Sequence, residues 1–115
     1  MSLSSRSYIT YLCGALTVFV MVFFKQQPAI VTVFAALMSI IVFSLRPTIG
    51  QGIVYVFLFT SALTVEIIVV NAGIWTYAVS EVFNIPLWIP FVWVNGGFVF
   101  IQFKEDVEKF WEKRA

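Results

Sequence analysis

Four long apolar runs, separated by short polar segments, extend along the whole chain. Three of the runs are uncharged, and the third in order contains a single charged residue, Glu66. A membrane-spanning helix needs about 20 predominantly apolar residues, with about 17 near the lower limit. The pattern therefore predicts four transmembrane helices, at about residues 6–25, 29–46, 52–76 and 86–104.

The segments that join these runs are short and contain turn-forming residues. Pro28 closes the first link and suits the first turn of the next helix, where its missing N–H is not needed. The second link contains Pro47 and Gly50, and the third, at about 77–86, is the longest. Short links force neighbouring helices to run antiparallel. We therefore expect an all-α fold, with one transmembrane domain over residues 1–115 built as an antiparallel four-helix bundle with short loops.

The composition agrees with a membrane protein. The chain is 61% hydrophobic and only 11% charged, whereas soluble globular domains are typically about 25% charged. A net charge of +1 offers little attraction for a polyanion, so we expect no nucleic-acid partner. The sequence has no histidine and one cysteine, Cys13, which removes the usual metal ligands. We expect neither a metal site nor a cofactor.

Basic residues gather on one side of the predicted bundle. With four spans, the N-terminus, the second link and the C-terminus share a side, and the opposite side has only Lys25. The shared side carries Arg6, Arg46, Lys104, Lys109, Lys113 and Arg114. By the positive-inside rule, both termini should be cytoplasmic, in a plasma or inner membrane.

The segment 104–115 is predicted to continue the fourth helix as an amphipathic tail. Val107, Phe110 and Trp111 fall at i, i+3 and i+4 and form one apolar stripe. The stripe could lie on the headgroup surface or dock against a partner subunit.

Glu66 is the most informative residue inside the predicted spans. It falls near the middle of the third span, where a charge costs about 2.5–3.5 kcal/mol on insertion scales. The side chain should therefore be neutral or face polar partners. Helical geometry places Gly73 and Tyr77 on its face and turns Trp75 nearly opposite. From their depths, we predict that Glu66 joins Asn71 and Asn95 in one intramembrane polar cluster.

Aromatic residues gather at the outer end, around the segment 84–90, which contains Pro86 and Pro90. They are Trp75, Tyr77, Trp88 and Trp93. They could form the aromatic belt of a membrane interface. Alternatively, the two prolines could bend the start of the fourth helix so that it roofs a lipophilic pocket.

The run 66–77 has the pattern E-x6-G-x-W-x-Y and is followed by the proline-containing run 84–93. This combination resembles small multi-helix membrane proteins related to carotenoid-biosynthesis hydratases and the lycopene cyclase domain. The matching positions are Glu66, Gly73, Trp75 and Tyr77. The resemblance implies an isoprenoid or carotenoid-type ligand, with Glu66 as the candidate catalytic acid. Some such cyclases are assembled from two chains of about this size.

Three hypotheses for function remain open, and they differ in whether the protein is an enzyme. The first is a non-catalytic accessory subunit of a larger membrane assembly. The second is an enzyme or binding protein for an isoprenoid-like lipid, with Glu66 as acid. The third is a small proton-coupled transporter that acts as an oligomer. Expected partners are membrane lipid and either copies of the chain or other membrane subunits.

Overall fold

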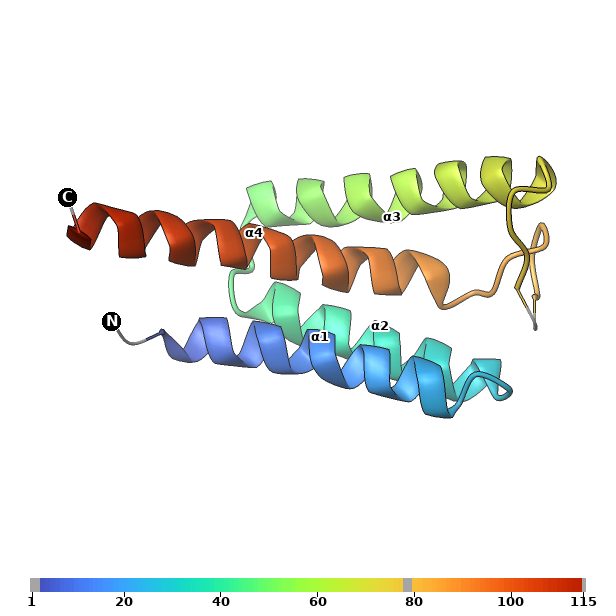
Figure 1. Ribbon diagram of the computed structural model, residues 1–115, viewed down its shortest axis with the longest axis horizontal. Coiled ribbons are helices and arrows are strands. Elements are labelled where there is room, and N and C mark those ends of the chain that lie inside the picture. Colours follow the sequence, from blue (N-terminus) through green and yellow to red (C-terminus); the bar gives the residue numbers. More distant parts are fainter. Residues whose placement is uncertain (1–2, 78–79, 115) are drawn as a thin grey trace.

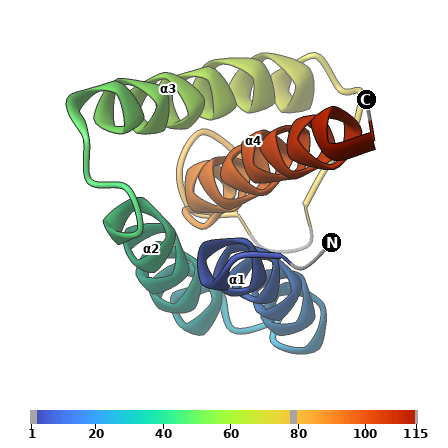
Figure 2. The same ribbon diagram turned by 90° about the vertical axis from the view of Figure 1, so that its left-hand side faces the viewer.

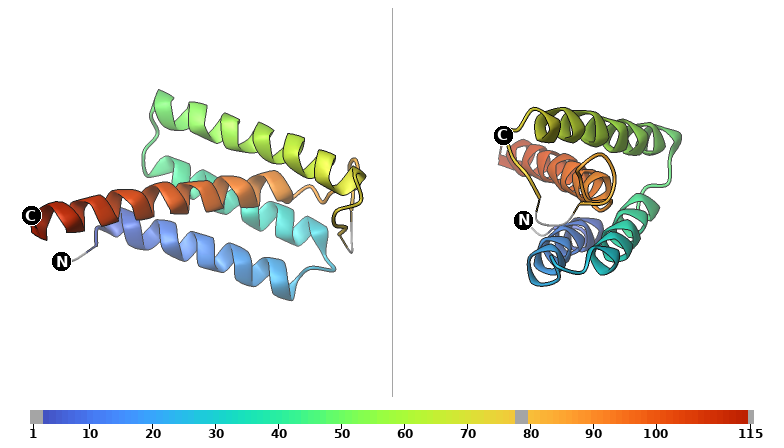
Figure 3. Two further views of the ribbon diagram at one scale, coloured as in Figure 1. Left: turned by 45° about the horizontal axis from the view of Figure 1, so that its top comes forward. Right: turned by 90° about the vertical axis from the view of Figure 1, so that its right-hand side faces the viewer.

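The computed structural model describes residues 3–77 and 80–114 and shows four helices joined by short links (Figure 1). The helices are α1 (Ser5–Phe23), α2 (Pro28–Ser44), α3 (Ile49–Asn71) and α4 (Ile89–Arg114). They alternate in direction, so both ends of the chain lie at the same end of the bundle (Figure 3). Within the described residues the extended pairing is limited to one isolated bridge, between Val82 and Ile85. The predicted all-α fold with four helices is confirmed.

Helix α4 is the centre of the bundle and packs against each of the other three helices (Figure 2). Glycines allow two of these close approaches. A methyl group at Gly97 would overlap the end of the Leu58 side chain on α3, and one at Gly14 on α1 would come within 2.7 Å of Val99 on α4. By contrast, α2 and α3 make few contacts with each other, although they are consecutive in the chain.

The helix ends follow local sequence chemistry. Ser4 caps α1 by accepting a hydrogen bond from the Ser7 backbone N–H at 3.1 Å, and Thr48 caps α3 in the same way. Pro28 occupies the first position of α2, as expected. The continuation of the fourth helix into the tail is also found, because α4 extends to Arg114.

The third helix ends earlier than the predicted span 52–76. Gly73 adopts a left-handed φ of 81°, and α3 stops at Asn71. The Ile74 N–H donates to the Val69 carbonyl and the Gly73 N–H to the Val70 carbonyl, which together make a Schellman motif. Glu66 therefore lies five residues, about 7.5 Å, before the end of the helix rather than near its middle.

Burial differs from that of a typical water-soluble protein, because polar side chains share the interior with apolar ones such as Val94 and Phe98 while many large apolar side chains lie outside. The buried polar or charged side chains are Ser7, Thr10, Thr17, Ser39, Glu66, Asn95, Gln102 and Asp106. Large apolar side chains are exposed along every helix, including Phe19 on α1, Leu37 on α2, Phe57 on α3 and Phe100 on α4. Two helices, α1 and α3, are long and apolar enough to cross a membrane, and α2 is apolar but shorter, at 17 residues.

Candidate functional site

Glu66 is buried near the end of α3, and three aromatic side chains donate hydrogen bonds to its carboxyl group. Its Oε2 accepts from Tyr77 Oη at 2.8 Å and from Trp75 Nε1 at 3.2 Å. Its Oε1 accepts from Trp93 Nε1 at 3.1 Å. We call these four residues the Glu66 cluster. The two oxygens of the carboxyl group have lone pairs enough for all three donors, and each of these donors is uncharged.

The early end of α3 is what brings this cluster together. Because the chain leaves the helix at Gly73, Trp75 and Tyr77 fold back toward Glu66, while Trp93 comes from the first turns of α4. The prediction that Trp75 points away from Glu66 was wrong, because it assumed a continuous helix. Trp88 lies outside the hydrogen-bonded set and packs edge-on against Tyr77, with ring centroids 6.0 Å apart.

Asn71 has other partners than Glu66. Its amide nitrogen donates to the carbonyl of Ile67 at 2.8 Å and to that of Phe83 at 3.2 Å. Its side-chain oxygen accepts a hydrogen bond from Asn84 at 2.9 Å. Phe83 and Asn84 both have positive φ, at 49° and 67°, as the central residues of a type I′ turn require. Asn71 therefore fastens this turn to the end of α3.

Asn95 is buried in the middle of the bundle, on the face of α4 that meets α1 and α2. Its amide nitrogen donates to Thr17 Oγ1 at 3.3 Å and to the Ala35 carbonyl at 3.2 Å. Its side-chain oxygen has no hydrogen-bond partner among the described residues. The structure therefore places Glu66, Asn71 and Asn95 in three different hydrogen-bonded groups, and the expected single cluster of these three residues is not formed.

A second polar centre, which sequence reasoning missed, lies at the end of the bundle that holds the termini. Asp106 accepts hydrogen bonds from Ser7 at 2.9 Å, from Gln102 at 3.0 Å and from the Tyr11 hydroxyl. Burial raises the pKa of Asp106, but these hydrogen bonds outweigh it and leave the pKa below its ordinary value. Gln102 and Asp106 are four residues apart on α4, a spacing that could have signalled a shared face.

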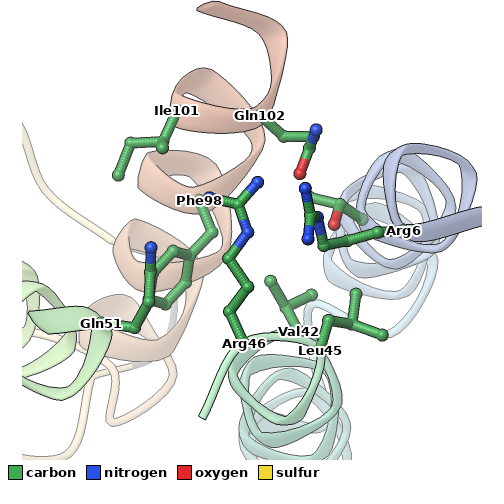
Figure 4. A pocket seen from close by; sticks show the side chains of 9 residues that line it. Arg6, Val42, Leu45, Arg46, Gln51, Phe98, Ile101 and Gln102 are labelled. Atoms are coloured by element: carbon green, nitrogen blue, oxygen red, sulfur yellow. The ribbon is translucent and has the colours of Figure 1, made fainter. Parts of the chain in front are cut away.

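Next to Asp106, Arg46 and Glu105 form a bidentate ion pair. This hydrogen bonding to the guanidinium is the main reason that the pKa of Glu105 lies below its ordinary value of 4.5. Arg6 and Arg46 face the same small cavity, together with the amide of Gln102 (Figure 4). Its volume is about 20 Å³, enough for one water molecule.

A much larger cavity lies at the opposite end, under the segment 82–87. It has a volume of about 420 Å³ and an almost wholly apolar lining, and we call it the loop cavity. Its walls come from α2, α3, the start of α4 and the turn at Phe83, and they include Thr32, Leu63, Ile67, Phe83, Pro86 and Phe91. Glu66 is not among the lining residues of this cavity or of the three others described.

The described residues hold no group of three or more His, Cys, Asp or Glu side chains placed to bind a metal ion. No family model, curated protein or solved structure matches the chain. The resemblance to carotenoid-biosynthesis membrane proteins therefore stays a prediction.

Proposed function

We propose that this chain is an integral membrane protein whose four helices all cross the bilayer, and that it serves as a non-catalytic accessory subunit of a larger membrane assembly. The exposed apolar surface, together with the buried polar side chains, carries the first part of the proposal. Polar side chains such as Ser39 and Asn95 are buried and hydrogen-bonded inside the bundle, while side chains such as Phe57 and Phe100 are exposed. Lipid is the solvent in which this arrangement is favourable, because unpaired polar groups are costly there and exposed apolar groups are not.

The arrangement of charge supports the proposed orientation. Arg6, Arg46 and Glu105 lie together at the end of the bundle where α1 begins, and Lys25, in the link between α1 and α2, lies at the other. The positive-inside rule then favours cytoplasmic termini. With α4 leaving the bilayer near Lys104, the remaining turns of α4 extend from the membrane surface and present the exposed side chains of Val107 and Trp111.

The hydrogen bonds of Glu66 support a structural role for this residue. Its carboxylate already accepts from three side chains of its own chain, and it borders none of the described cavities. An acid that protonates a substrate must lie within hydrogen-bond reach of it. This favours the accessory subunit over the hypotheses in which Glu66 acts as a catalytic acid or a proton carrier.

Membrane insertion and orientation can be tested together. In a Cys13→Ala background, we would place single cysteines at Ser4 and at Gln26 and label intact cells with a membrane-impermeant maleimide. Labelling of Gln26→Cys alone, with the protein retained in the pellet after alkaline extraction, is the expected result. Release of the protein by alkaline extraction would refute the integral membrane proposal.

The accessory role is tested by purification from native membranes in mild detergent, with quantification of each co-purifying chain. We expect at least one membrane protein in fixed stoichiometry, lost on Trp111→Ala but kept on Phe100→Ala, the matched change of an exposed aromatic residue earlier on α4. Recovery of the chain by itself, with a mass that indicates only copies of itself, would refute the role.

A further inference from the structure

We propose that the loop cavity is a binding site for a neutral lipid that has a long hydrocarbon body and one oxygen-bearing group, such as a long-chain alcohol or ketone. The inference goes beyond the accessory role, because it assigns a ligand to the chain itself. It rests on the shape of the cavity, on its lining and on one buried hydroxyl group, that of Thr32.

The cavity exists because α2 and α3 separate while a loop closes the gap between them. The two helices are joined by a short link at the end of the bundle that holds the termini and make few contacts with each other, and both pack against α4 (Figure 2). At the opposite end the turn at Phe83 and Asn84 covers the space, and Asn71 holds that turn in place. The turn at Phe83 and Asn84, which with Ile85 and Pro86 forms the roof of the cavity, is therefore held to α3 by hydrogen bonds.

The volume and the lining together define the class of ligand. An engineered cavity of about 150 Å³ holds benzene, so by proportion 420 Å³ corresponds to on the order of 15 carbon atoms. The lining contains no charged residue, and its polar surface is negligible. An ionic headgroup would lose its hydration without compensation, so the part of the ligand that enters must be apolar or neutral.

Thr32 supplies the specific contact. Thr32 is among the residues that line the cavity, and its Oγ1 is buried and has no hydrogen-bond partner among the described residues. The threonines on α3 differ in this respect, because Thr60 and Thr64 both donate to carbonyls of their own helix. A hydroxyl group can both donate and accept, so an alcohol or carbonyl oxygen of the ligand would satisfy Thr32.

A small molecule fits this space better than a helix of another subunit does. The roof formed by Ile85 and Pro86 is buried and closes the cavity at the outer end, which blocks a helix lying along the groove between α2 and α3. A single hydrocarbon chain, by contrast, can enter sideways between the two helices from the surrounding lipid.

The test uses hexadecanol with a diazirine near the middle of its chain, added to the full-length protein in mild detergent. After illumination, mass spectrometry locates the labelled residues. We expect labels on Leu63, Ile67 and Phe91, and competition by unlabelled hexadecanol about two- to tenfold stronger than by hexadecane, because the alkane cannot bond to Thr32.

Paired variants separate the cavity from the outer surface. Ile67→Trp should fill the cavity and reduce labelling at least about tenfold, whereas Ile68→Trp, the same change at the adjacent exposed position, should leave it unchanged. Thr32→Val should abolish the preference for the alcohol over the alkane, whereas Thr64→Val should keep it.

Two results would overturn the proposal. One is labelling spread evenly over exposed side chains with no excess at the cavity. The other is equal competition by hexadecanol and hexadecane in the unaltered protein. Both are measured without any substitution, so the conclusion stands even if Ile67→Trp fails to fold.

Discussion

Replacing Glu66 by glutamine should destabilise the protein, because the Glu66 cluster needs two oxygens that both accept. The glutamine oxygen can occupy the place of Oε2 and keep the bonds from Trp75 and Tyr77. Its NH₂ group then faces Trp93 Nε1, which was 3.1 Å from Oε1, so two donors meet. A side-chain hydrogen bond is worth about 0.5–1.5 kcal/mol, and a buried donor left unpaired costs about 1–3 kcal/mol. The two overlap, so we expect a loss of about 1–3 kcal/mol.

The measurement is the free energy of unfolding in mixed micelles, from a titration with a denaturing detergent followed by circular dichroism. Trp93→Phe removes only one donor and should cost about 1–2 kcal/mol. In the double variant, Glu66→Gln with Trp93→Phe, the glutamine NH₂ group no longer faces the indole N–H. Its loss in free energy of unfolding should therefore be at least about 1 kcal/mol smaller than the sum of the losses of the two single variants. Additive losses, or a cost of Glu66→Gln below about 0.5 kcal/mol, would show that the carboxyl group does not accept all three bonds.

Three further changes test other parts of the structure. Gly97→Ala should lower the free energy of unfolding by about 1–3 kcal/mol, because the new methyl group would overlap the Leu58 side chain on α3. Gly96→Ala, which has open space around it, should leave the free energy of unfolding unchanged or raise it by up to about 1 kcal/mol. Equal effects of the two changes would contradict the packing of α4 against α3. Because the folded protein lowers the pKa of Glu105, the ion pair stabilises the fold above the ordinary pKa of 4.5, and this stabilisation is lost as the pH falls through the lower folded value. Arg46→Gln should therefore reduce the loss of stability at acid pH, measured as melting temperature against pH in detergent. An unchanged pH profile would argue against the pair. Phe83→Asn should stabilise the protein by about 0.5–1 kcal/mol and raise its melting temperature, since asparagine tolerates a positive φ better than phenylalanine does. A lower melting temperature would indicate that the phenyl ring stabilises the turn by packing.

Sequence alone was sufficient for the number of helices and for the approximate place of each along the chain, although α3 and α4 begin three residues away from the predicted spans. The apolar runs are local features, and residues such as Pro28 act on the first turn of their own helix. The largest difference is at the end of α3, five residues before the predicted end of the span, although Gly73 marks that end in the sequence. Gly73 two residues after Asn71 matches a C-terminal helix cap, and it would have shortened the predicted span. An apolar pocket beneath the proline-containing segment before α4 was among the alternatives that the sequence left open.

The partners of the buried polar side chains were decided only by the tertiary structure. Glu66 was recognised because a carboxyl group in an apolar run is unusual, but its donors depend on the path that the chain takes after the helix ends. Ser7 and Asp106 are 99 residues apart and meet because α1 and α4 pack side by side. Hydropathy and helical period report which face of a helix is apolar. They carry no information on which other helix lies against that face, and this choice determines the side-chain hydrogen bonds between helices.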